Sequence, residues 1–338
     1  MPAPGRATIY DVAAAVGVSI STVSLCMNNP ARVRPETLKQ VLDAAERLGF
    51  QPRAEAVSRA RRAHDRVGVL APFTSYPSFA RRLNGVLRAY AKLGTEIVVH
   101  DHDSVASSAS PLLASLPLSE RLDGLIIMGV PLTAEIAQRL RRQRFNVVLI
   151  DVADEAAEEF SSVRIDEAGG GAMAARFLLE RGHRRFAFIG EEQASQQYRS
   201  PSEQRYEGFA DALRRAGIPA ADVVKRVVPH RMGRAGAAAL DLLDSPAPPT
   251  AFFAHDDVLA GGVLSAAQRS GRAVPEEVAV VGFDDLELAE QLGLTTVRLP
   301  FEESGRVAAE ILAERRQDPG RSVRQVLLRL SITERSSA

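Results

Sequence analysis

The chain has 338 residues, too many for one ordinary domain, and its 46% hydrophobic and 25% charged content is typical of a globular protein with two or three units. A single cysteine, Cys26, excludes an intrachain disulfide framework, and the absence of a signal sequence or a membrane-length apolar run leads us to expect a cytoplasmic protein. The formal net charge is zero, but residues 1–62 carry nine Arg and Lys against five Asp and Glu, so only this basic head of net charge +4 is expected to meet phosphate.

The stretch TIYDVAAAVGVSISTVSLCMNN is predicted to form two short helices joined by a sharp turn. The first helix places apolar residues at i, i+3, i+4 and i+7 between Ile9 and Val16. Gly17 follows it, and glycine adopts the left-handed conformation that ends a helix at little cost. Ser19 can cap the second helix, whose Val23 and Met27 lie four residues apart and should face the core.

A third helix is predicted to begin at Pro35 and to end at Gly49. Its buried face is expected to consist of Leu38, Val41, Leu42, Ala45 and Leu48. A helix, a glycine turn and a second short helix form the helix-turn-helix pattern, in which the second helix enters the major groove. The pattern alone also fits a generic three-helix bundle that docks on another protein.

The segment from Thr8 to Pro52 resembles the DNA-binding head of lactose-repressor-like (LacI/GalR) transcription regulators. The resemblance rests on the opening TIYDVA, the turn GVS, the following TVS and the exit LGFQP. It implies a homodimer that places two heads on a palindromic operator. The positions that would contact or support phosphates are Tyr10, Ser19, Thr22, Ser24 and Asn28.

Two further positions of that motif, Ile20 and Ser21, would be the main base-reading residues, and Leu25 stands where an arginine is very common in the family. Arginine there would form hydrogen bonds to guanine or a phosphate, whereas leucine offers only apolar contact, chiefly with a thymine methyl group. We therefore predict that Ile20 and Leu25 read thymine methyl groups and that Ser21 makes a short-range hydrogen bond.

The segment 51–66, QPRAEAVSRARRAHDR, is rich in Ala and Arg and is helical by propensity. In the resembled family this hinge folds on the operator and inserts a leucine into the minor groove, but this chain has Arg59 at that position. The departure suggests either a hinge in which Arg59 enters the minor groove or a weaker kink in the DNA. A plain solvated basic linker is the alternative. Arg53, Arg61 and Arg62 are expected to contribute phosphate contacts.

From residue 67 onward, short apolar runs alternate with longer amphipathic ones, which indicates parallel sheets covered by helices and divided between two lobes. The expected strands are Val67–Leu70, Ile97–Val99, Gly124–Met128, Val147–Ile150, Val163–Ile165, Phe186–Ile189, Ala251–Ala254 and Val278–Gly282. The expected helices are Phe79–Lys92, Glu135–Arg142, Gly170–Glu180, Gln204–Arg215 and Val258–Ser270. Ligands of such sheets bind at the carboxyl ends of the strands.

The run from Gly169 to Ala174 matches the G-x-G-x-x-A dinucleotide fingerprint, and Glu191 lies 20 residues beyond Gly171. Two acidic residues, Asp166 and Glu167, separate the preceding strand from the glycines and would lie near any pyrophosphate. The motif also occurs far along the chain rather than at a first strand. We therefore interpret these glycines as a site of tight helix-on-sheet packing rather than a cofactor site.

The family resemblance extends through the body in RYEGFADALRRAGI, VPEEVAVVGFDD, LTTVRLPFEESG and LRLSITERSS. It implies a two-lobed fold like that of the periplasmic sugar-binding proteins, with an effector between the lobes. The implied effector-binding residues are Phe73, Tyr76, Ser78, Phe79, Asp166, Arg205, Asp256, Phe283 and Asp284. Carboxylates, an arginine and aromatic faces suit a sugar.

Other chemistry finds less support. Two imidazoles and two carboxylates within four residues rarely complete a metal site without a distant ligand, so we expect a polar loop at His100-Asp101-His102-Asp103. Cys26 has no partner base, which argues against a nucleophile. We predict no enzymatic activity, no cofactor and no metal, and a sugar-binding transport component or a Rossmann-type oxidoreductase remain the alternatives. The expected organisation is an all-α helix-turn-helix head (residues 1–50), a hinge linker (51–66) and a two-lobed α/β effector-binding and dimerisation domain with parallel sheets (67–338).

Overall fold

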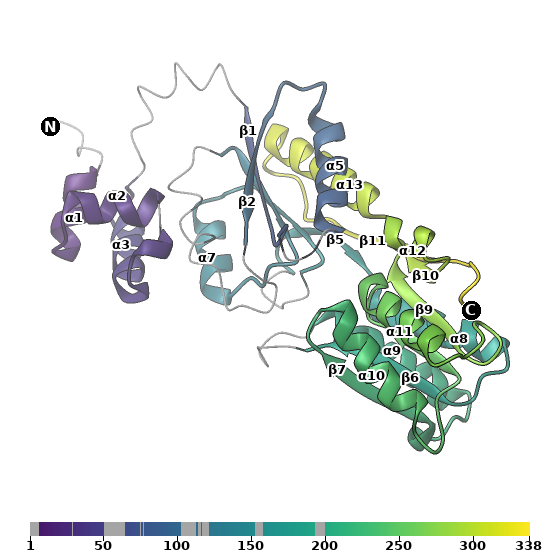
Figure 1. Ribbon diagram of the computed structural model, residues 1–338. Coiled ribbons are helices and arrows are strands. Elements are labelled where there is room, and N and C mark those ends of the chain that lie inside the picture. Colours follow the sequence, from purple (N-terminus) through teal and green to yellow (C-terminus); the bar gives the residue numbers. More distant parts are fainter. Residues whose placement is uncertain are drawn as a thin grey trace, which may run out of the picture. The chain divides into compact units, whose positions relative to one another are not determined.

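The computed structural model describes most of the chain outside the linker (Figure 1). The described residues are 7–28, 30–50, 65–74, 76, 78–102, 113, 116, 122–152, 158–192 and 200–338. The hinge residues Arg53, Arg59, Arg61 and Arg62 lie outside this set.

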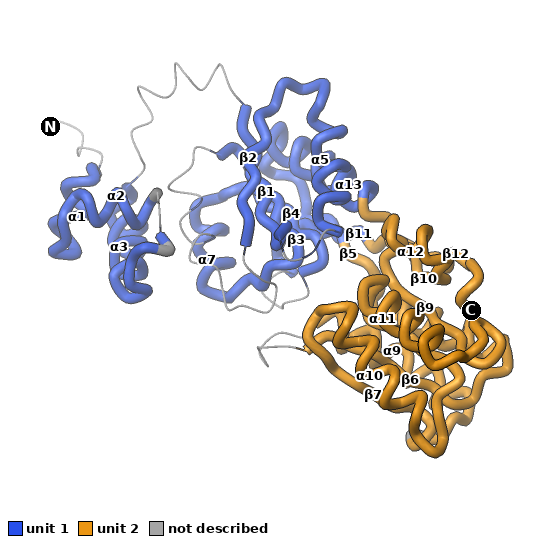
Figure 2. The backbone as a smooth tube through the Cα atoms, viewed as in Figure 1, with its two compact units in different colours: residues 1–163, 302–326 blue, residues 164–301, 327–338 orange. Residues whose placement is uncertain are grey.

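The chain forms two compact units (Figure 2). Unit 1 comprises residues 1–163 and 302–326, and unit 2 comprises residues 164–301 and 327–338. The polypeptide therefore passes between the units more than once, and residues 302–326 return to unit 1.

The head contains the predicted helix-turn-helix, and its helices are α1 (Ile9–Val16), α2 (Ile20–Asn28), the 3-10 turn η1 (Pro30–Arg32) and α3 (Pro35–Arg47). α1 and α2 are bent by 107° relative to each other, within the range typical of this motif. Gly17 ends α1 with φ 73°, and its N–H donates to the carbonyl of Ala13. Ser19 accepts a hydrogen bond from the backbone N–H of Thr22 at 3.1 Å, so the predicted cap of α2 is present.

The three helices enclose one small core. It contains Val12, Ala13, Val23, Cys26, Met27, Leu38, Val41, Leu42, Ala44, Ala45 and Phe50. The expectation that Leu48 belongs to this core was wrong, because α3 ends at Arg47 and Leu48 is 39% exposed. The chain turns back at Gly49, and the N–H of Phe50 donates to Ala45, so Phe50 fills the place expected for Leu48.

Unit 1 has a six-stranded sheet of order β11-β5-β4-β3-β1-β2. Its strands are β1 (Arg66–Ala71), β2 (Glu96–Asp101), β3 (Gly124–Met128), β4 (Val147–Ile150), β5 (Ser161–Ile165) and β11 (Gln325–Leu328). The pairs from β2 through β5 are parallel. The helices of this lobe are α5 (Ser78–Tyr90), α7 (Ala134–Arg142) and α13 (Phe301–Gln317).

Unit 2 repeats this plan with a six-stranded sheet of order β12-β10-β9-β8-β6-β7. Its strands are β6 (Phe186–Glu191), β7 (Val223–Val228), β8 (Ala251–Ala254), β9 (Ala279–Asp284), β10 (Thr295–Arg298) and β12 (Ser331–Thr333), of which β12 pairs antiparallel with β10. The helices are α8 (Glu167–Glu180), α9 (Pro201–Arg215), α10 (Met232–Leu243), α11 (Asp257–Arg269) and α12 (Glu287–Gln291), with the 3-10 turn η3 (Ala220–Asp222).

Both faces of the unit 2 sheet are covered, because successive strand residues point to opposite sides. In β6, Phe186 and Phe188 pack with α8 and α9, whereas Ala187 and Ile189 pack with α10 and α11. The strand is therefore apolar at every position, which is the pattern that identified it in the sequence.

Glycines let neighbouring helices approach closely in each lobe. A β-carbon on Gly171 of α8 would overlap the carbonyl oxygen of Arg205 on α9, and Gly170 faces the ring of Phe283 on β9. In unit 1, Gly85 of α5 and Gly305 of α13 make the equivalent approach. The interpretation of these glycines as helix-on-sheet packing is confirmed for Gly170. Gly171 packs against a helix instead, and Gly169 faces the carboxylate of Asp166 that caps α8.

The expected strands Gly124–Met128, Val147–Ile150 and Ala251–Ala254 agree with β3, β4 and β8 residue for residue. The sequence reading did not identify β7, β10, β11 or β12, nor the helices α10, α12 and α13. No single helix among the described residues is long and apolar enough to cross a membrane; the bent pair α1 and α2 meets the length and composition test only when taken together.

Candidate functional site

The outward surface of the head is apolar where the second helix would meet DNA. Ile20 is 41% exposed and Leu25 is 37% exposed, although Val23 and Cys26 of the same helix are fully buried. Ser21 is also exposed, and Tyr10 of α1 is 67% exposed. The neighbouring residues of α2 are buried in the core, whereas these large apolar side chains remain exposed to solvent. Several such side chains on so small a domain indicate a contact surface.

The polar residues of this surface support the turn. The hydroxyls of Ser19 and Thr22 lie 2.8 Å apart, and Thr22 and Ser24 are each partly buried rather than freely exposed. Ser19 and Thr22 lie at the N-terminus of α2, a position that suits contact with a phosphate. Asn28 is the last residue of α2, and the hinge arginines are outside the described residues.

A second polar site lies in unit 2, where strands β6, β8 and β9 end. Arg205, 5% exposed, extends from α9 and donates from Nε to Glu167 Oε2 at 2.6 Å and from Nη2 to Glu167 Oε1 at 3.3 Å. Its Nη1 donates to the carbonyl oxygen of His255 at 2.6 Å. The guanidinium carbon lies 3.6 Å from the ring centroid of Phe283, so the cation is stacked as well as paired.

Asp284 completes this part of the site at the end of β9, with Oδ1 3.9 Å from Nη1 of Arg205. Burial raises the pKa of Asp284 well above its usual value, and the nearby arginine only partly opposes that shift. Its backbone has φ 112°, a conformation that non-glycine residues rarely adopt. Such a strained residue at a strand end is typical of a position retained for its side chain.

Asp256 is held at the end of β8 by two contacts. Its Oδ1 accepts from the N–H of Leu259 at 2.8 Å and so caps α11, and its Oδ2 is hydrogen bonded to Nε2 of His230. Burial alone would lower the pKa of His230, but the hydrogen bond and charge of Asp256 outweigh it and raise the pKa to about 9. This pair is therefore an imidazolium and a carboxylate at neutral pH.

The neighbouring His255 has the opposite character. Burial, and then the charge of Arg205, lower its pKa to about 3, so the ring is neutral. Nδ1 lies 3.4 Å from Nη1 of Arg205, and Nε2 lies 3.5 Å from Oε2 of Glu191. Both contacts are satisfied by the tautomer in which Nδ1 accepts and Nε2 carries the proton.

Of the residues that the sequence assigned to unit 2, the structure brings together Arg205, Asp256, Phe283 and Asp284. Phe283 is fully buried, so it can support Arg205 but offers no face to a ligand. Asp166 is exposed and caps α8, with Oδ1 accepting from the N–H of Gly169 at 2.7 Å. The acidic residue that pairs with the arginine is its neighbour, Glu167.

The residues assigned to unit 1 form a separate group after β1. Tyr76 and Phe79 meet edge to face with centroids 6.2 Å apart, and Phe73 and Ser78 are partly exposed beside them. The loop is tied to the end of β2, because Thr74 Oγ1 donates to Asp101 at 2.6 Å.

Sequence reasoning missed an ion pair close to this loop in unit 1. Arg82 of α5 pairs with Asp151, which follows β4, and both side chains are largely buried. The guanidinium carbon of Arg82 lies 5.5 Å from the ring centroid of Phe79.

No group of three or more His, Cys, Asp or Glu within the described ranges could hold a metal ion. Cys26 is buried, and burial raises the pKa of its thiol, which disfavours the reactive thiolate. The polar groups of both lobes instead offer carboxylate acceptors and guanidinium donors at strand ends, an arrangement that suits a polyhydroxylated ligand.

Comparison with known proteins identifies both parts of the chain. Residues 8–53 match the family described as bacterial regulatory proteins, lacI family, and residues 175–338 match the periplasmic binding protein-like domain. Catabolite control protein A of Priestia megaterium is 30% identical over 91% of this chain and 92% of its own length. The transcriptional repressor CytR of Escherichia coli is 32% identical over 92% of this chain and 90% of its own length.

Solved structures agree with the sequence matches. The complex of the transcriptional regulator CelR with cellobiose is 28% identical with a TM-score of 0.69, and the match covers 98% of this chain and 100% of that one. A LacI family regulator from Enterococcus faecium with bound ribose is 26% identical with a TM-score of 0.70, over 81% of this chain and 98% of that one.

Proposed function

The chain belongs to the lacI family of bacterial regulatory proteins, and from that premise we propose that it is a repressor whose affinity for operator DNA is set by a sugar-like effector. As a member of this family it is a DNA-binding transcription regulator and not an enzyme. The basic head distinguishes the protein from a transport component. The glycine motif that suggested an oxidoreductase is explained by packing, because Gly171 lies against the backbone of α9.

For the operator, we propose a homodimer that places two heads on a palindrome in the bacterial cytoplasm. The observation that supports base reading through methyl groups is the exposure of Ile20 and Leu25 on α2. Selection of bound sequences from random DNA, with the intact protein, tests this assignment. We expect T·A at the base pair facing Leu25, and enrichment of G there would contradict it.

The hinge proposal concerns Arg59, which lies outside the described residues. An arginine at this position suits a narrow minor groove, whereas the leucine of the resembled family acts as a wedge. The same selection repeated with Arg59→Leu should change the preferred central base pairs. Identical central base pairs for both proteins would favour a plain basic linker.

For the effector, we propose a neutral sugar that binds the polar strand ends of the body. The single observation that carries this is the buried cluster of Arg205, Glu167, Asp256 and Asp284, because buried ionisable groups with shifted pKa values are concentrated at functional sites. The related structures with cellobiose and ribose support the same ligand class.

A panel of mono- and disaccharides, screened by the melting temperature of the full-length protein, tests this proposal. We expect one sugar to raise the melting temperature of the parent protein, because a ligand that binds only the folded state stabilises it. Asp256→Asn should weaken that response, and Asp241→Asn, an exposed change on α10, should not. No response to any sugar in the panel, or an equal response from both variants, would contradict the proposed site.

Regulation then follows from linkage. An effector that prefers one arrangement of the body shifts operator affinity by the ratio of its affinities for the two arrangements, and the operator shifts effector affinity by the same factor. The domain organisation we propose for this coupling is a head of residues 1–50, a hinge of residues 51–66 and an effector-binding body of residues 67–338.

A further inference from the structure

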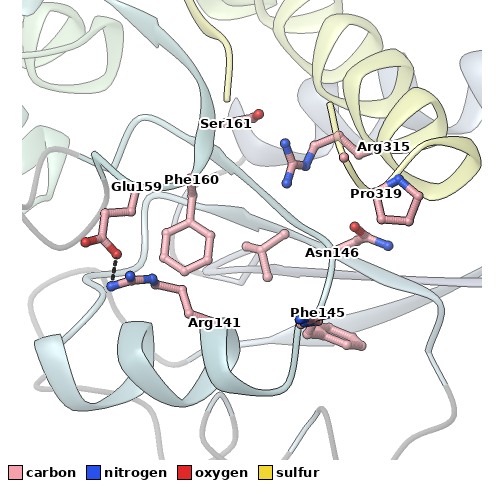
Figure 3. Close-up of a pocket in the computed structure, with 11 residues that line it drawn as sticks. Arg141, Phe145, Asn146, Glu159, Phe160, Ser161, Arg315 and Pro319 are labelled. Carbon is pink, nitrogen blue, oxygen red and sulfur yellow. Dashed lines mark ion pairs between the residues drawn. The ribbon is translucent and has the colours of Figure 1, made fainter. Parts of the chain in front are cut away.

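Unit 1 contains a cavity of about 460 Å³ that the proposed function does not use (Figure 3). It lies where β4 and β5 begin, at the opposite end of these strands from Asp151, which follows β4. Its walls come from the turn after α7, from residues 159–161 before and within β5, and from the end of α13 with the turn that follows it. The cavity is large enough for a small organic ligand.

The lining of this cavity is strongly basic. Arg141, Arg144 and Arg315 line it together with one described carboxylate, Glu159. Figure 3 shows that this carboxylate is paired with Arg141. Neither Arg144 nor Arg315 forms an ion pair with any carboxylate among the described residues. Two cationic side chains of the cavity therefore have no ion-pair partner among the described residues.

Arg315 also carries an unsatisfied donor. Its Nη1 donates to the carbonyl oxygen of Arg321 at 2.8 Å, but its Nε is buried and has no hydrogen-bond partner among the described residues. Figure 3 shows this side chain extending from α13 toward the strands. A buried N–H without an acceptor costs free energy, so the site is incomplete until an acceptor arrives.

The backbone of Arg144 gives an independent indication. It has φ 50°, and its N–H donates to Arg141 while the next N–H donates to Leu140, the pattern that closes a helix with a left-handed residue. Five other helices in the described part of the chain have glycine at the same position, two residues after the last helical residue. These glycines are Gly49, Gly182, Gly217, Gly271 and Gly293. Arginine is disfavoured in this conformation, and its side chain, which is exposed, is one of those that line the cavity.

The remainder of the lining is mainly apolar, with Asn146 and Ser161 as its polar members. Val147 and Phe160 are nearly buried, and Phe145 and Pro319 complete the wall beside the arginines. An anion alone would leave this surface without a partner, whereas a ring or hydrocarbon group would cover it.

We propose that this cavity binds a small phosphate ester with an apolar or ring-shaped body. Two unpaired guanidinium groups match the two negative charges of a phosphate monoester, and their planar donors match phosphate oxygens in pairs. Nε of Arg315 is buried in this conformation, so a phosphate would reach it only after a change of that side chain's rotamer. The ligand site is distinct from the sugar site, because it lies at the other end of the sheet in unit 1.

Calorimetric titration of the full-length protein with phenyl phosphate tests this proposal, with inorganic phosphate and phenol as matched probes. We expect phenyl phosphate to bind about tenfold tighter than inorganic phosphate and phenol to give no measurable binding, because the site needs both charge and apolar contact. Phenyl phosphate that shows no binding, or binds no better than inorganic phosphate, would overturn the proposal.

Variants of the two arginines separate binding from folding. Arg144→Gly should weaken phenyl phosphate binding about tenfold without lowering the melting temperature, since glycine adopts the left-handed conformation freely. Arg315→Met should weaken binding similarly, while Arg226→Met, an exposed change on β7, should leave it unchanged. Equal binding by all three variants would place the ligand elsewhere and contradict the assignment. Displacement of phenyl phosphate by duplex DNA of random sequence would show instead that these arginines contact the DNA backbone.

Discussion

Replacing Arg205 with methionine removes the guanidinium from the buried cluster of unit 2 while keeping an aliphatic side chain over Phe283. In the parent protein the Arg205 and Glu167 residues are 5% and 8% exposed, and two hydrogen bonds join them at 2.6 and 3.3 Å. Methionine leaves the Glu167 carboxylate buried without its cation. Breaking one partner of such a pair costs about 3–5 kcal/mol of the free energy of unfolding.

Removing the second charge should restore most of that loss. Replacing a buried ion pair with apolar residues of similar volume is often neutral, so Arg205→Met combined with Glu167→Leu should be more stable than Arg205→Met alone by about 2–4 kcal/mol. The control is Arg88→Met, which breaks the pair with Glu302, whose side chains are 74% and 40% exposed. That loss should be at most about 1 kcal/mol.

Urea-induced unfolding of the full-length proteins, followed by circular dichroism, gives these differences from the transition midpoints. If Arg205→Met costs no more than Arg88→Met, the Arg205 pair is solvated in solution, and the reasoning from burial fails. If the double variant is no more stable than Arg205→Met, the arginine acts through Phe283 or the His255 carbonyl rather than through Glu167.

Three further predictions concern the head, the histidine pair and the helix packing. Leu25→Arg should change the preferred base pair facing residue 25 from T·A to G·C, with G·C favoured by about 1–3 kcal/mol of binding free energy in selection from random DNA. An unchanged preference would show that Leu25 does not face a base. In the folded state the pKa of His230 is raised from its ordinary value of 6.5 to about 9. Its contribution to the free energy of unfolding, at most about 3 kcal/mol, is therefore fully present below pH 6.5 and is lost as the pH rises to 9. Thermal unfolding across this range should show the decline, and His230→Gln should flatten it; a variant with the parent's profile would refute the pairing with Asp256. Gly171→Ala should lower the free energy of unfolding by roughly 1–3 kcal/mol because its methyl group overlaps a carbonyl of α9. Gly233→Ala on α10, which meets open space, should raise it by about 0.5–1 kcal/mol; equal effects of the two alanines in chemical denaturation would contradict the close approach.

The head could be predicted almost completely from its sequence, because its signals are local. Gly17 and Gly49 end helices, Ser19 caps one and Pro35 begins another, and each of these depends on residues within one turn. Leu48 was assigned to the core incorrectly because the helical spacing of apolar residues in the sequence continues past Arg47, where the helix ends. The chain reversal at Gly49 then places Phe50 in the core instead.

In the body, the strands that are apolar at every position were found, as was the edge strand β2. The edge strands β7, β11 and β12 and the inner strand β10 were not found. β7 is an edge strand paired with β6, and it includes Lys225 and Arg226. Its pattern of apolar and polar residues therefore resembles that of a polar segment rather than a buried strand. β12 has three residues and takes its place only through antiparallel pairing with β10. Such strands are determined by distant partners rather than by their own residues.

The site shows the same limit. Arg205, Asp256 and Asp284 follow recognisable motifs and were predicted, but Glu167 and His230 were not. Glu167 was noted only as an obstacle to a phosphate, since nothing local indicates that it faces an arginine 38 residues away. His230 follows β7, and because that strand was not predicted, no sequence signal placed His230 near Asp256.

The central claim is that a sugar bound to the body changes the affinity of the head for its operator. Its most direct test is the dissociation constant of the full-length protein for the selected operator, measured by fluorescence anisotropy with and without the sugar that most raises the melting temperature. We expect a change of at least about fivefold, reduced by Asp256→Asn and retained by Asp241→Asn. A sugar that binds and stabilises the protein yet leaves operator affinity unchanged would contradict the claim.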